Sequence, residues 1–99
     1  MTQRYGAMMV RAAQIRAARG LIGWNQAQLA EAAGLSVPTI KRMEGPTGPG
    51  RSTAANLAAV IHALEMAGVE FTNGAAPGVR LMPRAGFVRP EDLTSETDW

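Results

Sequence analysis

The sequence predicts one mainly helical domain of four to five helices, followed by a short C-terminal β-hairpin and a flexible tail. Apolar residues recur at helical spacing in four segments, and glycines and polar N-cap residues separate these segments. Two short β-like runs follow the helices. A chain of 99 residues builds one compact core and has no room for a second. We therefore expect a helical domain at 1–68, a hairpin at 69–82 and an acidic tail at 83–99.

The first helix is predicted over residues 7–19. Its apolar stripe consists of Met8, Ala12 and Ile15. Beyond this stripe, Gly20 and Gly23 bracket two apolar residues, and this pair of glycines predicts a break before Trp24.

The second and third helices are predicted from their caps. Asn25 is a good N-cap for the second helix, and Gly34 ends it because glycine adopts the left-handed conformation without strain. One residue later, Ser36 caps the third helix, whose first turn tolerates Pro38. The apolar positions are Leu29, Ala30 and Ala33 in the second helix, and Ile40 and Met43 in the third. The two helices form a helix-turn-helix at about residues 25–44.

Residues 45–50 contain three glycines and two prolines, which predict a loop. A fourth helix is expected over 52–66, with Ser52 as its N-cap and Gly68 just beyond its end. Its apolar stripe consists of Leu57, Val60, Ile61 and Leu64. The runs 69–72 and 79–82 then predict a small hairpin.

Charge is unevenly distributed along the chain. Residues 1–52 carry seven basic and two acidic side chains, whereas residues 83–99 carry two basic and four acidic ones. A basic first half favours binding to a polyanion such as nucleic acid. A solvated surface with a chance asymmetry explains the same counts equally well, so charge alone leaves both interpretations open.

Composition argues against catalysis and against a membrane protein. The chain has no cysteine, both aspartates lie in the tail, and the only histidine, His62, has no evident carboxylate partner. The glycine-rich loop lacks the lysine of a phosphate-binding P-loop. No signal-peptide pattern and no apolar run of about 20 residues is present. We expect a cytoplasmic, non-enzymatic protein without metal or cofactor.

The segment 24–44, WNQAQLAEAAGLSVPTIKRME, resembles the helix-turn-helix of the lambda-repressor-like, or Xre-type, transcriptional regulators. The resemblance covers roughly residues 15–68. The positions that carry it are Arg19, Gly23, Gln26, Leu29, Ala30, Gly34, Ile40 and Glu44.

The resemblance implies that the third helix, about residues 36–44, lies in the major groove of double-stranded DNA. The DNA-binding positions that it implies are Asn25, Gln26, Ser36, Val37, Pro38, Thr39, Lys41, Arg42, Thr47 and Arg51. Among these, Gln26 is implied to contact a phosphate and to brace the recognition helix. Arg42 is the favoured base contact, because a guanidinium pairs bidentately with guanine.

Several of these positions have a second interpretation. Val37 and Pro38 stand where some relatives carry glutamines, so the DNA target of those relatives does not transfer to this chain. Lys41 is alternatively a solvated surface charge. Arg19 and Glu44 are implied to form a structural ion pair between the first helix and the end of the third.

The sequence leaves more than one candidate partner for the segment after Gly68. A single such module buries only about 600–1,000 Å² on DNA, and the resemblance implies a homodimer on a two-fold site. The hairpin is a candidate dimerisation element; pairing across a dimer axis or against the first helix would protect its edge. The alternative is an antitoxin or adaptor whose C-terminal arm, with Phe87 and Trp99, binds a protein partner. A third hypothesis keeps the helix-turn-helix for protein contact alone.

Overall fold

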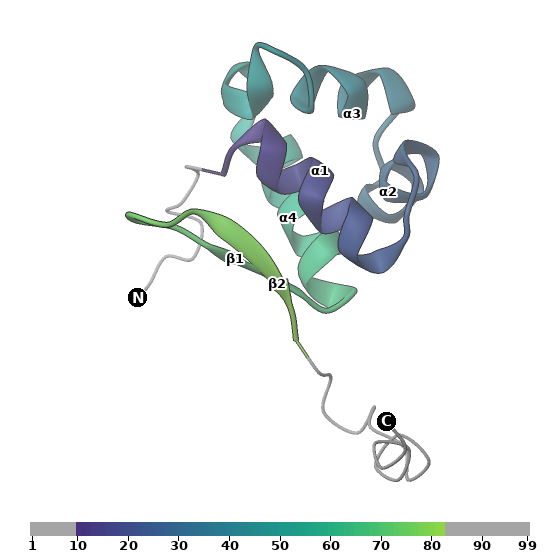
Figure 1. Ribbon diagram of the computed structural model, residues 1–99. Coiled ribbons are helices and arrows are strands. Elements are labelled where there is room, and N and C mark those ends of the chain that lie inside the picture. Colours follow the sequence, from purple (N-terminus) through teal and green to yellow (C-terminus); the bar gives the residue numbers. More distant parts are fainter. Residues whose placement is uncertain (1–9, 83–99) are drawn as a thin grey trace, which may run out of the picture.

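Four helices and one antiparallel hairpin make up the described part of the chain, residues 10–82, in a computed structural model (Figure 1). The elements are α1 (Ala12–Ile22), α2 (Gln26–Ala33), α3 (Val37–Met43), the 3₁₀ turn η1 (Gly48–Arg51), α4 (Ala54–Met66), β1 (Val69–Thr72) and β2 (Gly78–Leu81). The mainly helical fold with a C-terminal hairpin is confirmed. The tail expected at 83–99, with Phe87 and Trp99, lies outside the described residues.

The caps predicted for α2 and α3 are present. Asn25 Oδ1 accepts a hydrogen bond from the Gln28 amide at 2.7 Å, and Ser36 Oγ accepts one from the Thr39 amide at 3.2 Å. Gly34 ends α2 at a φ of 72°, in the left-handed region that favours glycine. These caps make the turn between α2 and α3 short and define where the second of the two helices begins.

The predicted bounds of α1, 7–19, are wrong at both ends. The helix begins at Ala12, because the Gln14 side chain accepts from the Arg11 amide at 2.8 Å and completes the first turn. It continues through Gly20 to Ile22 and ends at Gly23, whose φ is 73°. The predicted break lies at the second glycine alone. Met8, expected on the apolar stripe, is outside the described residues.

Smaller shifts affect α4 and the hairpin. Thr53, rather than Ser52, caps α4, since its Oγ1 accepts from the Asn56 amide at 3.0 Å. The second strand runs one residue earlier than expected, because the hairpin register pairs Val69 with Leu81.

The core lies between α1, α2, α3 and α4. Its largest fully buried side chains are Ile15, Leu29, Ile40, Met43, Val60, Ile61 and Leu64. Each helix contributes at least one of these residues, so the helix-turn-helix is held in place by α1 and α4.

The hairpin packs against α1 through one buried amide. Gln14 is only 4% exposed, and its Nε2 donates to the carbonyls of Thr72 at 2.9 Å and Gly78 at 3.0 Å. These two residues are partners in the ladder, so both strands are held at one point. This amide favours one placement of the hairpin on α1, because any placement that left the buried amide unpaired would cost about 1–3 kcal/mol. The hairpin therefore packs against the first helix, which is one of the two arrangements considered for it.

Within residues 10–82, no helix combines the length and apolar character required to cross a membrane.

Candidate nucleic-acid interface

Helix α3 lies at the surface, at the end of the molecule away from the hairpin (Figure 1). Ile40 and Met43 anchor it to the core with 0% and 1% of their surface exposed. Pro38, Lys41 and Arg42 are exposed on its other side. The burial of Ile40 and Met43 agrees with their prediction as the apolar positions of this helix.

A row of polar side chains follows the outer face of α3. Ser36 Oγ and Thr39 Oγ1 are 2.9 Å apart, and Arg42 Nη2 approaches Thr39 Oγ1 at 3.5 Å. A spacing of three residues puts these side chains on adjacent turns of one helix face. The row begins at the cap and ends at a guanidinium, so it combines hydroxyls with a charged donor.

Val37 differs from its neighbour Pro38. Val37 is half-buried and packs against the core, whereas Pro38 is exposed. Pro38 therefore presents more apolar surface than Val37 to a molecule lying against α3.

The far end of α3 is held by Glu44, which is buried. Arg19 donates to its carboxylate from Nε at 2.6 Å and from Nη2 at 2.9 Å. The two side chains are 19% and 3% exposed, respectively. Gln26 Nε2 adds a third donor at 3.0 Å from Oε1. This cluster connects α1, the start of α2 and the end of α3.

The cluster keeps Glu44 ionised. Burial acts to raise the pKa of this carboxyl group, but the hydrogen bonds from Arg19 and Gln26, together with the positive charges of Arg19 and Arg16, outweigh burial and leave the pKa below its ordinary value. The Glu44 carboxylate in turn raises the pKa of Arg19.

Gln26 contacts the end of the recognition helix directly through this hydrogen bond. An amide nitrogen carries two hydrogens, so the contact with Glu44 occupies one and leaves the second for another acceptor. Bracing of α3 and a phosphate contact are therefore chemically compatible for this side chain.

Arg16 makes a contact that the sequence did not predict. Its Nη1 donates to the backbone carbonyl of Glu44 at 2.6 Å. Its position one turn before Arg19 on α1 was the available signal, because residues three apart share a helix face.

A polar hollow of about 250 Å³ adjoins the outer face of α3. Its lining comes from the end of α3, from η1 and from the start of α4. The lining residues are Arg42, Thr47, Gly48, Ser52, Thr53 and Asn56. All but the glycine carry hydrogen-bonding side chains, which suits a small polar or anionic group.

A protein-family model described as helix-turn-helix matches residues 15–65, which extend from α1 to the last turn of α4. The chain belongs to the lambda-repressor-like helix-turn-helix family. This is a family of DNA-binding transcription regulators and not of enzymes, and the chain is accordingly a DNA-binding regulator. No curated protein matches the chain.

The remaining candidate positions of this helix-turn-helix lie around α3 but not on it. Asn25 is exposed and its side-chain oxygen caps α2. Thr47 is exposed and lines the polar hollow. Arg51 ends η1, and its side chain is outside the described part. The candidate positions thus occupy the start of α2, α3 and the segment after α3.

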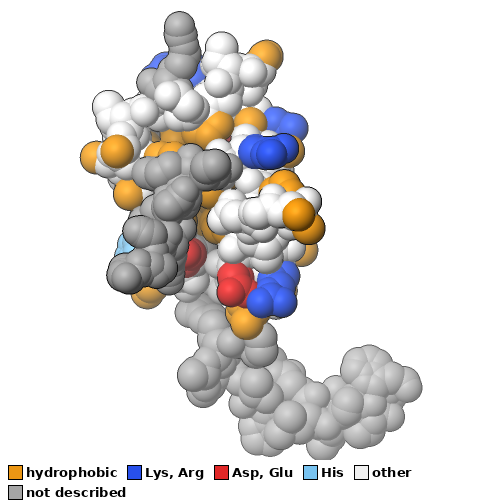
Figure 2. Space-filling view, turned by 90° about the vertical axis from the view of Figure 1, so that its left-hand side faces the viewer, with side chains coloured by type: hydrophobic (Ala, Val, Ile, Leu, Met, Phe, Trp, Pro, Cys, Tyr) orange, Lys and Arg blue, Asp and Glu red, His pale blue; other side chains and the backbone are white. Residues whose placement is uncertain are grey.

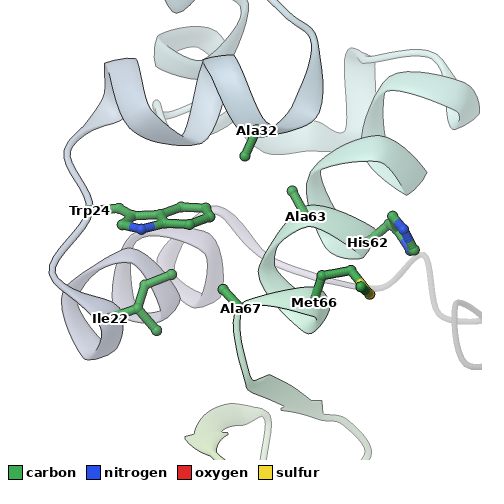
Figure 3. Close-up of a pocket in the computed structure, with 7 residues that line it drawn as sticks. All are labelled: Ile22, Trp24, Ala32, His62, Ala63, Met66 and Ala67. Atoms are coloured by element: carbon green, nitrogen blue, oxygen red, sulfur yellow. The ribbon is translucent and has the colours of Figure 1, made fainter. Parts of the chain in front are cut away.

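Trp24 lies in a separate groove of about 590 Å³ between the end of α1, α2 and the last turns of α4 (Figure 3). The indole is half-buried, packs against the core and shares this groove with Ile22 and Met66. Arg19 Nη1 donates to the Trp24 carbonyl at 3.0 Å, and this hydrogen bond connects the Trp24 side of the groove to the Glu44 cluster. The indole of Trp24 therefore has a packing role.

Proposed function

We propose that the chain is a sequence-specific regulator that binds double-stranded DNA with the outer face of α3 in the major groove. The observation that carries this proposal is the division of α3 into two faces. Ile40 and Met43 are buried, while Lys41 and Arg42 are exposed. A major groove about 12 Å wide admits a helix presented in this way.

The side chains of α3 divide into base and backbone contacts by their chemistry. Arg42 contacts a guanine, since its guanidinium matches the two acceptors of that base. Thr39 orients the guanidinium and offers its own hydroxyl. Lys41 neutralises a phosphate, and Pro38 and Val37 contact a thymine methyl group or exclude other bases by shape.

Two further groups of residues grip the DNA backbone in this proposal. Asn25, Gln26 and Ser36 lie at or beside the N-termini of α2 and α3. We assign their side-chain donors to phosphates of one DNA strand. Thr47 contacts a second phosphate at the polar hollow. Hydroxyl and amide side chains in the lining of the hollow support this role. Arg51, whose side chain is outside the described part, is assigned to the DNA backbone as well.

Salt dependence tests the backbone contacts. Each phosphate neutralised by a side chain steepens the plot of log affinity against log salt by about 0.9. We expect Lys41→Gln to reduce the slope by about one such step for each bound protomer, and Arg80→Gln, on the hairpin, to leave the slope unchanged. Both changes remove one exposed positive charge, so they are matched. Equal slopes for all three proteins would contradict the assignment of Lys41.

We further propose that the chain acts as a homodimer, with residues 69–82 as the dimerisation element of the domain formed by 1–68. Leu81 and Met82 support this proposal, since they are 54% and 40% exposed at the end of the hairpin. Hydrophobic side chains reach the surface at several separate places on the face drawn in Figure 2. A two-stranded sheet also leaves strand edges that a second copy would pair.

The mass of the protein in solution tests the homodimer. We expect a dimer mass for the wild type, alone or on DNA, and a monomer mass for Leu81→Glu, because a buried charge opposes an apolar contact. Ala75→Glu is the control, since it adds the same charge to the exposed hairpin turn. A monomer mass for the wild type in both conditions would exclude the dimer.

A further inference from the structure

We propose that Arg16 is a positioning residue that fixes the C-terminal end of the recognition helix α3. The inference rests on the proposed role of α3 in DNA binding. It starts from the 2.6 Å hydrogen bond between Arg16 Nη1 and the Glu44 carbonyl, which joins α1 to α3 across 28 residues of sequence.

Helix α3 needs support at this end. It has only seven residues, and helices of that length are not stable on their own. Its N-terminus has the Ser36 cap, whereas its C-terminal end is closed only by turn hydrogen bonds from the Glu44 and Gly45 amides. Glu44 is the C-cap residue, so its carbonyl is where the helix backbone ends. A guanidinium at this point satisfies a carbonyl and also opposes the negative end of the helix dipole.

Arg16 and Arg19 hold different parts of the same residue. Arg19 binds the carboxylate of Glu44, which is connected to the backbone through rotatable side-chain bonds. Arg16 binds the carbonyl, which belongs to the backbone itself. The carboxylate contact holds α3 against the core, and the carbonyl contact restricts the direction in which the last turn of α3 points.

This restriction matters for the neighbouring DNA-contacting side chains. Lys41 and Arg42 lie in the last turn of α3, three and two residues, respectively, before the carbonyl that Arg16 holds. A displaced helix end would move their side chains relative to the major groove, and recognition groups misplaced by about 1 Å bind much more weakly.

Arg16 is exposed, so a direct phosphate contact is the competing role for its charge. The two roles differ in salt dependence. Loss of a phosphate contact lowers affinity and also reduces the salt slope by about one. Loss of a positioning contact lowers affinity and leaves the slope unchanged, because the same phosphates are still neutralised.

The experiment compares the wild type with Arg16→Ala, Arg16→Lys and the control Arg11→Ala, in the full chain and on duplex DNA at several salt concentrations. Arg11 is also an exposed arginine on the N-terminal side of α1, so its removal changes the charge equally. We expect about tenfold weaker binding for Arg16→Ala with an unchanged slope, near wild-type binding for Arg11→Ala, and partial recovery for Arg16→Lys. A reduced slope, or unchanged affinity, would overturn the proposal.

Hydrogen exchange of the free protein separates this inference from the proposed function. The amides of Glu44 and Gly45 donate to the carbonyls of Ile40 and Arg42, at 3.0 and 3.1 Å. We expect these two amides to exchange faster in Arg16→Ala while core amides of α4 keep their protection. Unchanged exchange would refute the positioning role, whereas faster exchange in a protein that does not bind DNA would refute only the proposed function.

Discussion

Replacing Arg19 by methionine is expected to lower the free energy of unfolding by about 3–5 kcal/mol, because it leaves a buried carboxylate without its main partner. The Glu44 side chain is 3% exposed, and Arg19 provides two of the hydrogen bonds to it. The apolar part of the arginine side chain is largely replaced by methionine, so the loss reports on the ion pair and on the hydrogen bond to the Trp24 carbonyl rather than on a cavity. Urea denaturation at neutral pH measures it.

The hairpin supplies a matched control. Arg80 also contacts a carboxylate at 2.6 Å, that of Glu70, but these two side chains are 63% and 44% exposed. Because water screens an exposed pair, Arg80→Met is expected to cost no more than about 1 kcal/mol. Similar losses for Arg19→Met and Arg80→Met would contradict the structural role of the buried pair.

The same pair predicts how stability depends on pH. The folded state lowers the pKa of Glu44 from its ordinary value of 4.5, so the carboxylate stabilises the fold above that pH. The contribution is lost as the pH falls below 4.5 through the lower folded-state value. The stability difference between the wild type and Glu44→Gln should therefore shrink in acid.

Replacing Arg42 by alanine is expected to weaken DNA binding by about 1–3 kcal/mol and to relax the preference at one base pair. Arg42 is exposed at the end of the polar row that starts at Ser36, so its removal leaves the core intact. Thermal unfolding checks that the variant is folded. Binding to duplexes that differ at single positions measures the effect.

The pattern of the loss distinguishes two roles for Arg42. A base contact affects one base pair more than the others, whereas a phosphate contact at the polar hollow affects all sequences alike. Unchanged affinity would favour the third hypothesis, in which the helix-turn-helix serves protein contact alone.

Local signals explain which parts of the fold were predictable. Asn25, Gly34 and Ser36 act on backbone groups within a few residues of themselves, so the sequence shows where α2 ends and α3 begins. The end of α1 was predicted too early, because Gly20 and Gly23 both qualify as a stop and only the second adopts a positive φ.

Contacts between residues that are distant in sequence could not be predicted from local patterns. Gln14 is a polar residue whose partners, Thr72 and Gly78, lie 58 and 64 residues away, so no local pattern indicates its role in holding the hairpin. The Arg16 contact with the Glu44 carbonyl is hidden for the same reason. The geometry of Arg19 beside Glu44 agrees with what the family resemblance implied, although charge and spacing alone do not identify that pair.

Selection of bound duplexes from a random DNA pool, at about physiological salt, tests the central claim most directly. Specific sites bind about 10³–10⁷ times more tightly than non-specific DNA, so several rounds should enrich one motif. If α3 reads the major groove as a dimer, that motif should contain two inverted half-sites about one helical turn apart. A pool that stays random after selection with folded protein would contradict sequence-specific recognition.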